Sequence, residues 1–241
     1  MMQPSTAIIL AAGSGTRMGS GPRKQYRNIR SRPVLAWSLE AFVKSPVISD
    51  IVLVVPEGEE EYIRQEITPM VPGAEDKLRL CVPGGAQRYD SVFNGLRAIT
   101  WPCDYVFIHD GARPLISQDA LKRLYESVRT QQACVAGMPS KDTVKIADSS
   151  GCVLQTPDRS SVWIVQTPQV FERKLITDAY AELMEALAEL RRKGISITDD
   201  AMVLEQMSGH PVYLVEAGYE NIKITTPEDM LLAEALLEQR V

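Results

Sequence analysis

The sequence predicts an α/β protein with a doubly wound, mostly parallel sheet, because three patterns occur together. Short apolar segments rich in β-branched residues alternate with segments of helical periodicity through the first half of the chain. These apolar segments are hydrophobic on both faces, as strands are when helices cover both sides of a parallel sheet. The first of them runs into a glycine-rich turn, which allows backbone N–H groups to approach a phosphate.

The first half of the chain predicts strands and helices in strict alternation. The strands are expected at residues 6–10, 50–55, 78–82, 104–109 and 133–138, and the helices at residues 33–44, 57–67, 89–99 and 118–128.

The pattern changes after residue 140, where DTVKIA, GCVLQT and SVWIV are separated by the turn sequences SSG and PDRSS. We expect this segment to form a β-hairpin arm that projects from the sheet. After it the sequence predicts helices at 173–193, 199–207 (capped by Thr198) and 227–238, and strands at 212–215 and 221–225. Since no linker or internal repeat interrupts the chain, residues 1–241 are expected to form a single domain with a projecting arm at about 139–162.

Composition limits the classes of function. With 45% hydrophobic and 24% charged residues, the chain is neither disordered nor fibrous. Its apolar runs are far shorter than the roughly 20 residues of a membrane span, and no signal peptide is expected. Four cysteines without a CxxC pair and two histidines argue against structural zinc and fit a reducing cytoplasm. A net charge of −5 argues against nucleic-acid and membrane-surface partners but permits a small anionic ligand.

The glycine-rich turn, LAAGSGTRMGSGPRKQ, matches neither of two common nucleotide-binding fingerprints. GxxxxGK[ST] is absent, and GxGxxG fails because Met18 stands at the third glycine position. By itself the turn is equally compatible with a tight strand-to-helix connection. Arg17, Arg23 and Lys24 follow within a segment broken by glycine and proline, and such grouped cations suit a triphosphate or form a solvated basic loop.

LAAGSGTRMG with Lys24 and Gln25 resembles the signature loop of sugar-nucleotide pyrophosphorylases and nucleotidyltransferases. Further segments, in the same order, resemble the 2-C-methyl-D-erythritol 4-phosphate cytidylyltransferase family of the non-mevalonate isoprenoid pathway. They are PGGAQRYDSV (83–92), HDGARP (109–114), KDTVK (141–145), TPDRSSVWIVQTPQ (156–169), ITDDAMVLE (197–205) and NIKITTPEDMLLAE (221–234).

This resemblance implies a Rossmann-like nucleotidyltransferase fold and a homodimer formed through the arm. The implied reaction transfers CMP from CTP to methylerythritol phosphate, with Mg²⁺ as cofactor. The attacking phosphate monoester has a second pKa near ~6, so no strong general base is needed, and His109 is expected to pack rather than catalyse. The problem is repulsion between anions, which positive charge and positioning solve.

The resemblance also implies roles for individual residues. Arg17 and Lys24 would stabilise the transition state, and Lys223 would work with Arg159 to orient the acceptor phosphate. Asp110 ends a predicted strand at the ligand-binding edge and suits Mg²⁺, although a helix N-terminal carboxylate is the alternative. The expected CTP-binding residues are Ala11, Ala12, Gly13, Ser14, Gly15, Gly84, Gly85, Arg88 and Ser91. The expected acceptor-binding residues are Asp110, Arg113, Thr143 and Thr167, with Thr143 and Arg159 reaching the partner's site.

Two departures from the family pattern leave alternatives open. Arg23 stands between Pro22 and Lys24, so it could share the role of Lys24. Gly111 replaces an alanine found in many members, and HDGARP resembles ribitol 5-phosphate cytidylyltransferases equally well. Ribitol 5-phosphate is therefore the alternative acceptor. A catalytically silent, nucleotide-binding regulatory subunit is the alternative class, although Arg17, Lys24 and Asp110 count against it.

Overall fold

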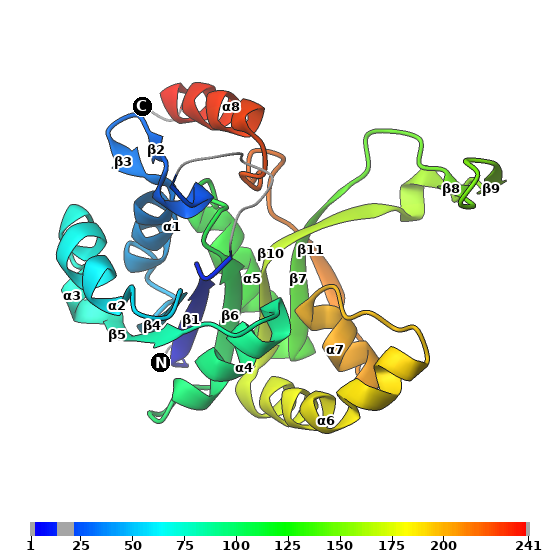
Figure 1. Cartoon of the computed structure of the whole chain (residues 1–241), viewed down its shortest axis with the longest axis horizontal. Helices are drawn as coiled ribbons and strands as arrows, with labels where there is room; N and C mark the ends of the chain where they lie inside the picture. Colours follow the sequence, from blue (N-terminus) through cyan, green and yellow to red (C-terminus); the bar gives the residue numbers. More distant parts are fainter. Residues whose placement is uncertain (1–2, 14–21, 240–241) are drawn as a thin grey trace.

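The computed structural model describes residues 3–13 and 22–239, and within them seven strands form one sheet (Figure 1). The strand order is β11-β7-β10-β6-β1-β4-β5. The strands are β1 (Ser5–Leu10), β4 (Asp50–Val55), β5 (Leu78–Pro83), β6 (Tyr105–Asp110), β7 (Ala133–Pro139), β10 (Trp163–Glu172) and β11 (Tyr213–Glu216). The predicted fold class, a mostly parallel α/β sheet, is confirmed.

The order of the strands reverses direction at β1. The chain moves from β1 through β4 to β5 on one side, and then returns to place β6 on the other side. In the parallel pair of β1 and β6, Leu10 lies opposite Asp110, so both strands end at the same level. Open α/β sheets bind ligands outside the carboxyl ends of the strands at such a switch point.

Strand β10 was not predicted at its full length, and it is antiparallel to both of its neighbours, β6 and β7. The sequence SVWIV was assigned to the arm, but Trp163–Val165 pairs with Gly137–Pro139 of the main sheet. Its side chains are half exposed here, which concealed a strand that becomes buried only from Gln166 onward.

Helices cover both faces of the sheet because successive side chains of its strands point to opposite sides. Ile9, Leu53 and Phe107 are buried on one face, with α1 (Val34–Val43) and α5 (Gln118–Gln131). The other face buries the residues one position earlier, Ile8, Val52 and Val106. It is covered by α4 (Arg88–Ala98), α6 (Arg173–Arg192) and α7 (Asp200–Met207).

A small third core forms where helix α8 (Pro227–Glu238) packs on the hairpin of β2 (Asn28–Ile29) and β3 (Arg32–Pro33). The helix predicted at 227–238 is confirmed with the same bounds. Its start carries a capping box formed by Thr226 and Asp229, which was not predicted. The described helices include none that is long and apolar enough to cross a membrane.

Three local predictions are wrong. Residues 221–225 form no strand, because their backbone bonds to loops instead: Ile224 N–H donates to the carbonyl of Ala112 at 2.8 Å. Thr198 does not cap the helix that follows, since the carboxylate of Asp199 accepts the Met202 N–H at 2.9 Å.

The third concerns the helix predicted at 57–67. Regular helix is limited to α2 (Glu60–Tyr62), followed by a π-helical turn (Ile63–Ile67) and a 3-10 turn (Thr68–Met70). Gly58 has a φ of 82°, so residues 57–58 form a turn and delay the start of the helix. A further short helix, α3 (Ala74–Lys77), was not predicted.

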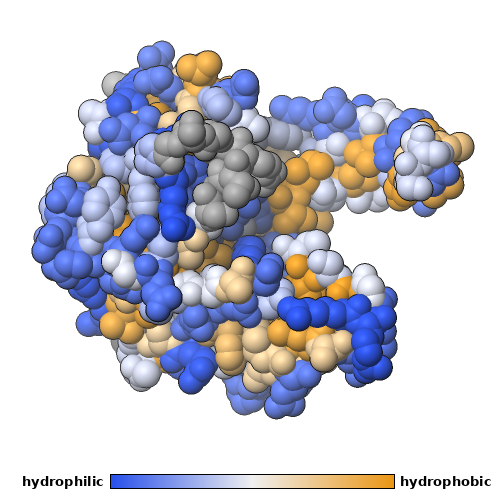
Figure 2. All heavy atoms as spheres, viewed as in Figure 1, coloured by the Kyte–Doolittle hydropathy of each residue, from blue (hydrophilic) through white to orange (hydrophobic). Residues whose placement is uncertain are grey.

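The arm extends away from the sheet, as Figure 1 shows at the right. Its outer part is a two-stranded antiparallel hairpin, β8 (Ile146–Ala147) and β9 (Val153–Gln155), and a 3-10 turn (Arg159–Ser161) leads back into β10. Figure 2 shows that the molecule is hollowed between the arm and the side formed by α6 and α7, with hydrophobic side chains at the root of the arm.

Candidate functional site

A cavity of about 440 Å³ opens at the carboxyl ends of β1 and β6, where the topology of the sheet predicts a ligand. It combines backbone of the glycine-rich turn with charged side chains from three other segments. Its lining residues are Leu10, Ala11, Ala12, Gly13, Lys24, Gln25, Gly85, Ala86, Gln87, Arg88, Ser91, Asp110, Ala112 and Lys223.

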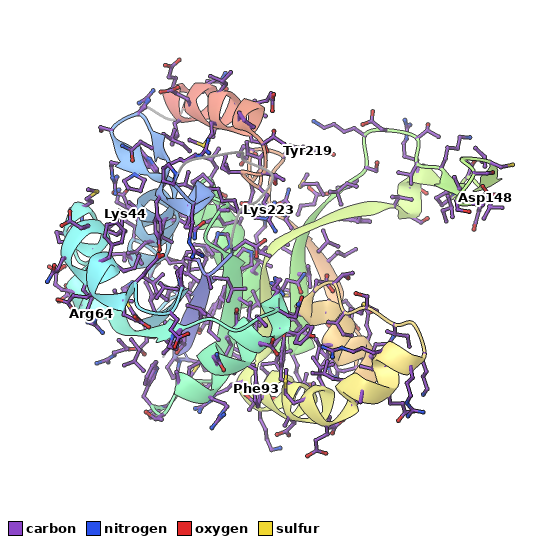
Figure 3. All side chains as sticks on the ribbon, viewed as in Figure 1. Lys44, Arg64, Phe93, Asp148, Tyr219 and Lys223 are labelled. Atoms are coloured by element: carbon purple, nitrogen blue, oxygen red, sulfur yellow. The ribbon has the colours of Figure 1, made fainter. Side chains whose placement is uncertain are left out.

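Asp110 lies at the centre of the charged part of this cavity. Its Oδ2 is 2.7 Å from Lys223 Nζ, and its Oδ1 is 3.5 Å from Arg88 Nε. In Figure 3 Lys223 lies near the middle of the molecule, close to the end of the sheet. Burial alone would raise the pKa of Asp110, but Arg88, Lys223 and Arg113 together hold it well below its ordinary value. The carboxylate is therefore charged at neutral pH.

Arg88 is fixed from behind by Asp200, the first residue of α7. Its Nη1 and Nη2 donate to the two carboxylate oxygens of Asp200 at 2.8 and 2.7 Å. Asp200 is completely buried and also accepts a hydrogen bond from the Tyr180 hydroxyl. Burial would lower the pKa of Arg88, but Asp200 and Asp110 raise it, so the guanidinium stays charged. The guanidinium is thus held rigidly beside the cavity.

The two glycine-containing segments touch each other. A Cβ added to Gly84 would lie 2.3 Å from the Cβ of Ala12, so only glycine allows this approach. The neighbouring Gly85 N–H donates to the hydroxyl of Ser91 at 3.0 Å, which joins the turn after β5 to the start of α4. The backbone after β1 and the turn after β5 consequently form one continuous wall.

Lys24 faces this wall from a 3-10 turn (Lys24–Tyr26). The side chain of its neighbour Gln25 is almost fully buried, and its Nε2 donates to the carbonyl of Ala11 at 2.5 Å and to that of Gly13 at 3.3 Å. Arg23 has two contacts: its Nε is 3.5 Å from a carboxylate oxygen of Glu59, and its Nη1 donates to the carbonyl of Ala12 at 3.4 Å. It supports the wall from outside and is not part of the cavity lining.

His109 has the packing role expected from the sequence. The side chain is completely buried, its Nε2 is 3.0 Å from the carbonyl of Arg113, and its Nδ1 is 3.1 Å from Thr167 Oγ1. Burial lowers the pKa of His109 to about 4, so the imidazole is neutral at pH 7. The Thr167 hydroxyl also accepts the backbone N–H of Asp110 at 3.0 Å, which ties β10 to the end of β6.

A second cavity of about 380 Å³ adjoins the first, and Lys223 lines both. Arg113 lies on its wall, where its Nη1 donates to the carbonyl of Asn221 at 2.8 Å. Burial lowers the pKa of Arg113. Lys141, at the root of the arm, contributes another positive charge, 3.5 Å from the centre of the Tyr219 ring.

The structure does not bring all of the predicted residues together. Thr143 and Arg159 are exposed on the arm, outside both cavities of this chain. Ser14, Gly15 and Arg17 lie outside the described residues. Conversely, the cavity is also lined by four residues for which no role was predicted: Gln25, Ala86, Gln87 and Ala112. Each adjoins a residue that was predicted, so adjacency to a motif was the signal available.

The residues of the cavity suit Mg²⁺ only together with a ligand. Among the described residues there is no cluster of three or more histidine, cysteine or acidic side chains that could hold a metal by itself. Asp110 is the acidic residue of the described lining, and it remains ionised. Because Mg²⁺ commonly takes one or two carboxylates plus phosphate oxygens and water, a single ionised aspartate facing a phosphate-sized cavity fits this ion.

Comparison with known proteins identifies the family. The sequence model of 2-C-methyl-D-erythritol 4-phosphate cytidylyltransferase matches residues 5–239. The enzyme of that name from Lachnoclostridium phytofermentans is 45% identical over 99% of this chain and 98% of its own length. The one from Lachnospira eligens is 44% identical over 97% of this chain and 99% of its own.

A solved structure agrees. The 4-diphosphocytidyl-2C-methyl-D-erythritol synthase of Anaerococcus prevotii superposes with a TM-score of 0.84 at 34% identity, over 98% of this chain and 96% of that protein. With the fold, the cavity and these full-length matches in agreement, the chain belongs to the 2-C-methyl-D-erythritol 4-phosphate cytidylyltransferase family, and it is a nucleotidyltransferase.

Proposed function

We propose that this chain transfers CMP from CTP to 2-C-methyl-D-erythritol 4-phosphate, giving 4-diphosphocytidyl-2-C-methyl-D-erythritol and pyrophosphate. The observation that carries this proposal is the meeting of three cations around one cavity, with Lys24 on one wall and Lys223 and Arg88 beside Asp110 on another. An acidic chain that concentrates positive charge at the end of its sheet is suited to anionic substrates.

In the reaction, an oxygen of the acceptor phosphate forms a bond to the α-phosphorus of CTP, and the bond from that phosphorus to the pyrophosphate oxygen breaks. The acceptor phosphate is mostly a dianion at neutral pH, so no side chain has to remove a proton. This agrees with His109, which is buried, neutral and engaged in hydrogen bonds. The chain has to hold the acceptor phosphate against the triphosphate of CTP, and fixed cations offset the repulsion between these anions.

The two sides of the cavity divide this task. Lys24 and the backbone of Ala11–Gly13 would hold the triphosphate, and Arg17 would join them as the family resemblance implies. Gly84, Gly85, Arg88 and Ser91 would form the pocket for the base and ribose. Lys223, Arg113 and Thr167 are placed to hold the acceptor, since Lys223 lines both cavities. Asp110 would hold Mg²⁺, which neutralises phosphate charge when bound.

We further propose that the arm completes the acceptor site of a second copy of the chain, with Thr143 and Arg159 as the contributed residues. Ile146, Val153 and Leu154 of the outer hairpin are 47–66% exposed, which suits a surface that a second copy covers. A homodimer of this kind would place the polar residues of one arm at the cavity of the other chain. The four unpaired cysteines support a reducing compartment, and we place the reaction in the cytoplasm.

The test is pyrophosphate release from CTP and Mg²⁺ with methylerythritol phosphate, ribitol 5-phosphate or no acceptor. We expect release with methylerythritol phosphate alone, because that is the acceptor in the name of the family. Release with ribitol 5-phosphate alone would refute the proposed acceptor while keeping the chemistry. Binding of CTP without pyrophosphate release under any of the three conditions would support a catalytically silent regulatory subunit instead.

A further inference from the structure

Asn221 occupies a junction between three segments that carry proposed acceptor residues. Its side chain is completely buried, and its Nδ2 donates to Gln166 Oε1 and to the carbonyl of Thr167, both at 2.9 Å. Its own carbonyl accepts the hydrogen bond from Arg113 Nη1 at 2.8 Å. Lys223 follows two residues later in the chain and reaches Asp110.

An irregularity in strand β10 explains why an amide is needed here. The register of β10 against β7 shifts between Val165 and Gln169, so the segment that contains Thr167 departs from the regular ladder. Bulges beside active sites re-aim a side chain, and here the Thr167 hydroxyl meets the N–H of Asp110. The carbonyl of Thr167 then requires a donor from outside the ladder, and the buried amide of Asn221 supplies it.

The same amide fixes the loop between β11 and α8. Gln166, which accepts the other Asn221 hydrogen bond, donates through its Nε2 to the carbonyl of Gly218 at 3.0 Å. The Asn221 N–H donates to that carbonyl as well, at 3.3 Å. These hydrogen bonds hold the loop after β11 against the bulge of β10. Lys223 lies in the same loop, two residues after Asn221.

We propose that Asn221 is a positioning residue for the acceptor half of the cavity, which sets Thr167, Arg113 and Lys223 relative to one another. This inference rests on the proposed function, because it assumes that those three residues hold the phosphate and the hydroxyl groups of the acceptor. Among the described residues, the hydrogen-bond partners of Asn221 lie in β10, in the loop after β6 and in the loop after β11.

The test is Asn221→Asp, which keeps the size of the side chain but replaces two donated hydrogen bonds by repulsion between oxygens. We expect the KM for methylerythritol phosphate to rise about tenfold or more, as for a lost buried hydrogen bond, while the KM for CTP stays within about twofold. A merely structural role would shift both constants together, or the melting temperature alone. Either of those results, or an unchanged acceptor KM, would overturn the inference.

Two further variants keep this test decisive. Gln166→Met removes one of the two acceptors of the Asn221 amide and serves if Asn221→Asp does not fold; we expect a smaller change in the acceptor KM in the same direction. Asn94→Asp is the matched control, because the Asn94 amide also donates to a backbone carbonyl, that of Pro83, but on helix α4. Its acceptor KM should equal that of the wild type.

The wild-type assay separates failure of the inference from failure of the proposed function. If the wild type transfers CMP to methylerythritol phosphate and both Asn221→Asp and Gln166→Met keep its acceptor KM, only the inference is wrong. If the wild type releases no pyrophosphate with this acceptor, the proposed function fails, and the inference fails with it.

Discussion

Lys223 Nζ lies 2.7 Å from Asp110 Oδ2, and this ion pair joins the loop after β11 to the carboxyl end of β6. Burial favours the neutral acid, but Arg88 and Lys223 outweigh it and keep the pKa of Asp110 below its ordinary value. One carboxylate therefore balances two cations, one of which, Lys223, lines both of the neighbouring cavities.

Asp110→Asn should lower kcat by about 100-fold or more, because it removes the proposed Mg²⁺ ligand and the anion that orients Lys223. The measurement is the initial rate as a function of Mg²⁺ concentration, in which the variant should require far more Mg²⁺. Asp104→Asn is the control, since Asp104 precedes the same strand at its opposite, exposed end. A variant with the wild-type rate and Mg²⁺ dependence would show that Asp110 has no such role.

Lys24→Ala and Arg23→Ala form a matched pair of adjacent cations. Lys24 lines the cavity, whereas Arg23 lies outside the lining, where it pairs with Glu59 and donates a long hydrogen bond to the carbonyl of Ala12. We expect Lys24→Ala to lower kcat by about 100-fold or more, and Arg23→Ala to change it by no more than about threefold, because an exposed ion pair contributes little. Equal losses in single-turnover assays of the two variants would mean that both cations serve the phosphates.

The sheet could be predicted from the sequence because its strands are buried on both faces. Residues 50–55 of β4, for example, are apolar at nearly every position, and the predicted bounds are those observed. Strand β10 escaped prediction for the opposite reason, since its first residues are half exposed and its register shifts after Val165. Local periodicity does not record a strand whose two halves have different surroundings.

The candidate site divides in the same way. Motifs identified Lys24, Asp110 and Lys223, and these line one cavity. The buried amides of Gln25 and Asn221, which donate to the carbonyls of Ala11 and Thr167, could not be identified as supports. A buried amide has no pattern in the sequence, and its partners are distant along the chain. Such roles depend on the tertiary structure alone.

The burial of His109 should make the folded protein less stable in acid. Burial lowers the pKa of His109 to about 4, whereas the pKa of an imidazole in the unfolded chain is about 6.5. Between these two pKa values the unfolded chain binds a proton at His109 more readily than the folded chain does. The contribution of His109 to the free energy of unfolding is therefore complete above about pH 6.5 and is lost as the pH falls to about 4. The full difference corresponds to roughly 3 kcal/mol.

Urea unfolding at a series of pH values checks this expectation. The free energy of unfolding of the wild type should fall more steeply between about pH 6.5 and about pH 4 than that of His109→Gln. Parallel curves for the wild type and His109→Gln would contradict the assignment.

A mixture of two inactive variants tests the arm. If Arg159 serves the partner's cavity, mixed dimers of Lys24→Ala and Arg159→Ala contain one site with an intact cavity and an intact arm. Random exchange should then restore about a quarter of the wild-type activity. Mixing Lys24→Ala with Lys223→Ala is the control, because both changes lie in the cavity of their own chain and no site is repaired. Equal activity in the two mixtures would place Arg159 in its own chain's site.

Gly84→Ala and Gly13→Ala should separate close packing from contact with the ligand. A Cβ on Gly84 would lie 2.3 Å from the Cβ of Ala12, whereas a Cβ on Gly13 would have no neighbour within 4 Å among the described residues. Overpacking of this kind costs about 1–3 kcal/mol, so Gly84→Ala should lower the free energy of unfolding and Gly13→Ala should not. Calorimetry with CTP completes the comparison: Gly84→Ala should bind CTP more weakly because it displaces the wall of the cavity.

A loss of CTP affinity in Gly13→Ala at unchanged stability would place the nucleotide directly against this backbone. If Gly84→Ala kept both stability and affinity, the two glycine segments could not form the rigid wall on which the proposed nucleotide site depends.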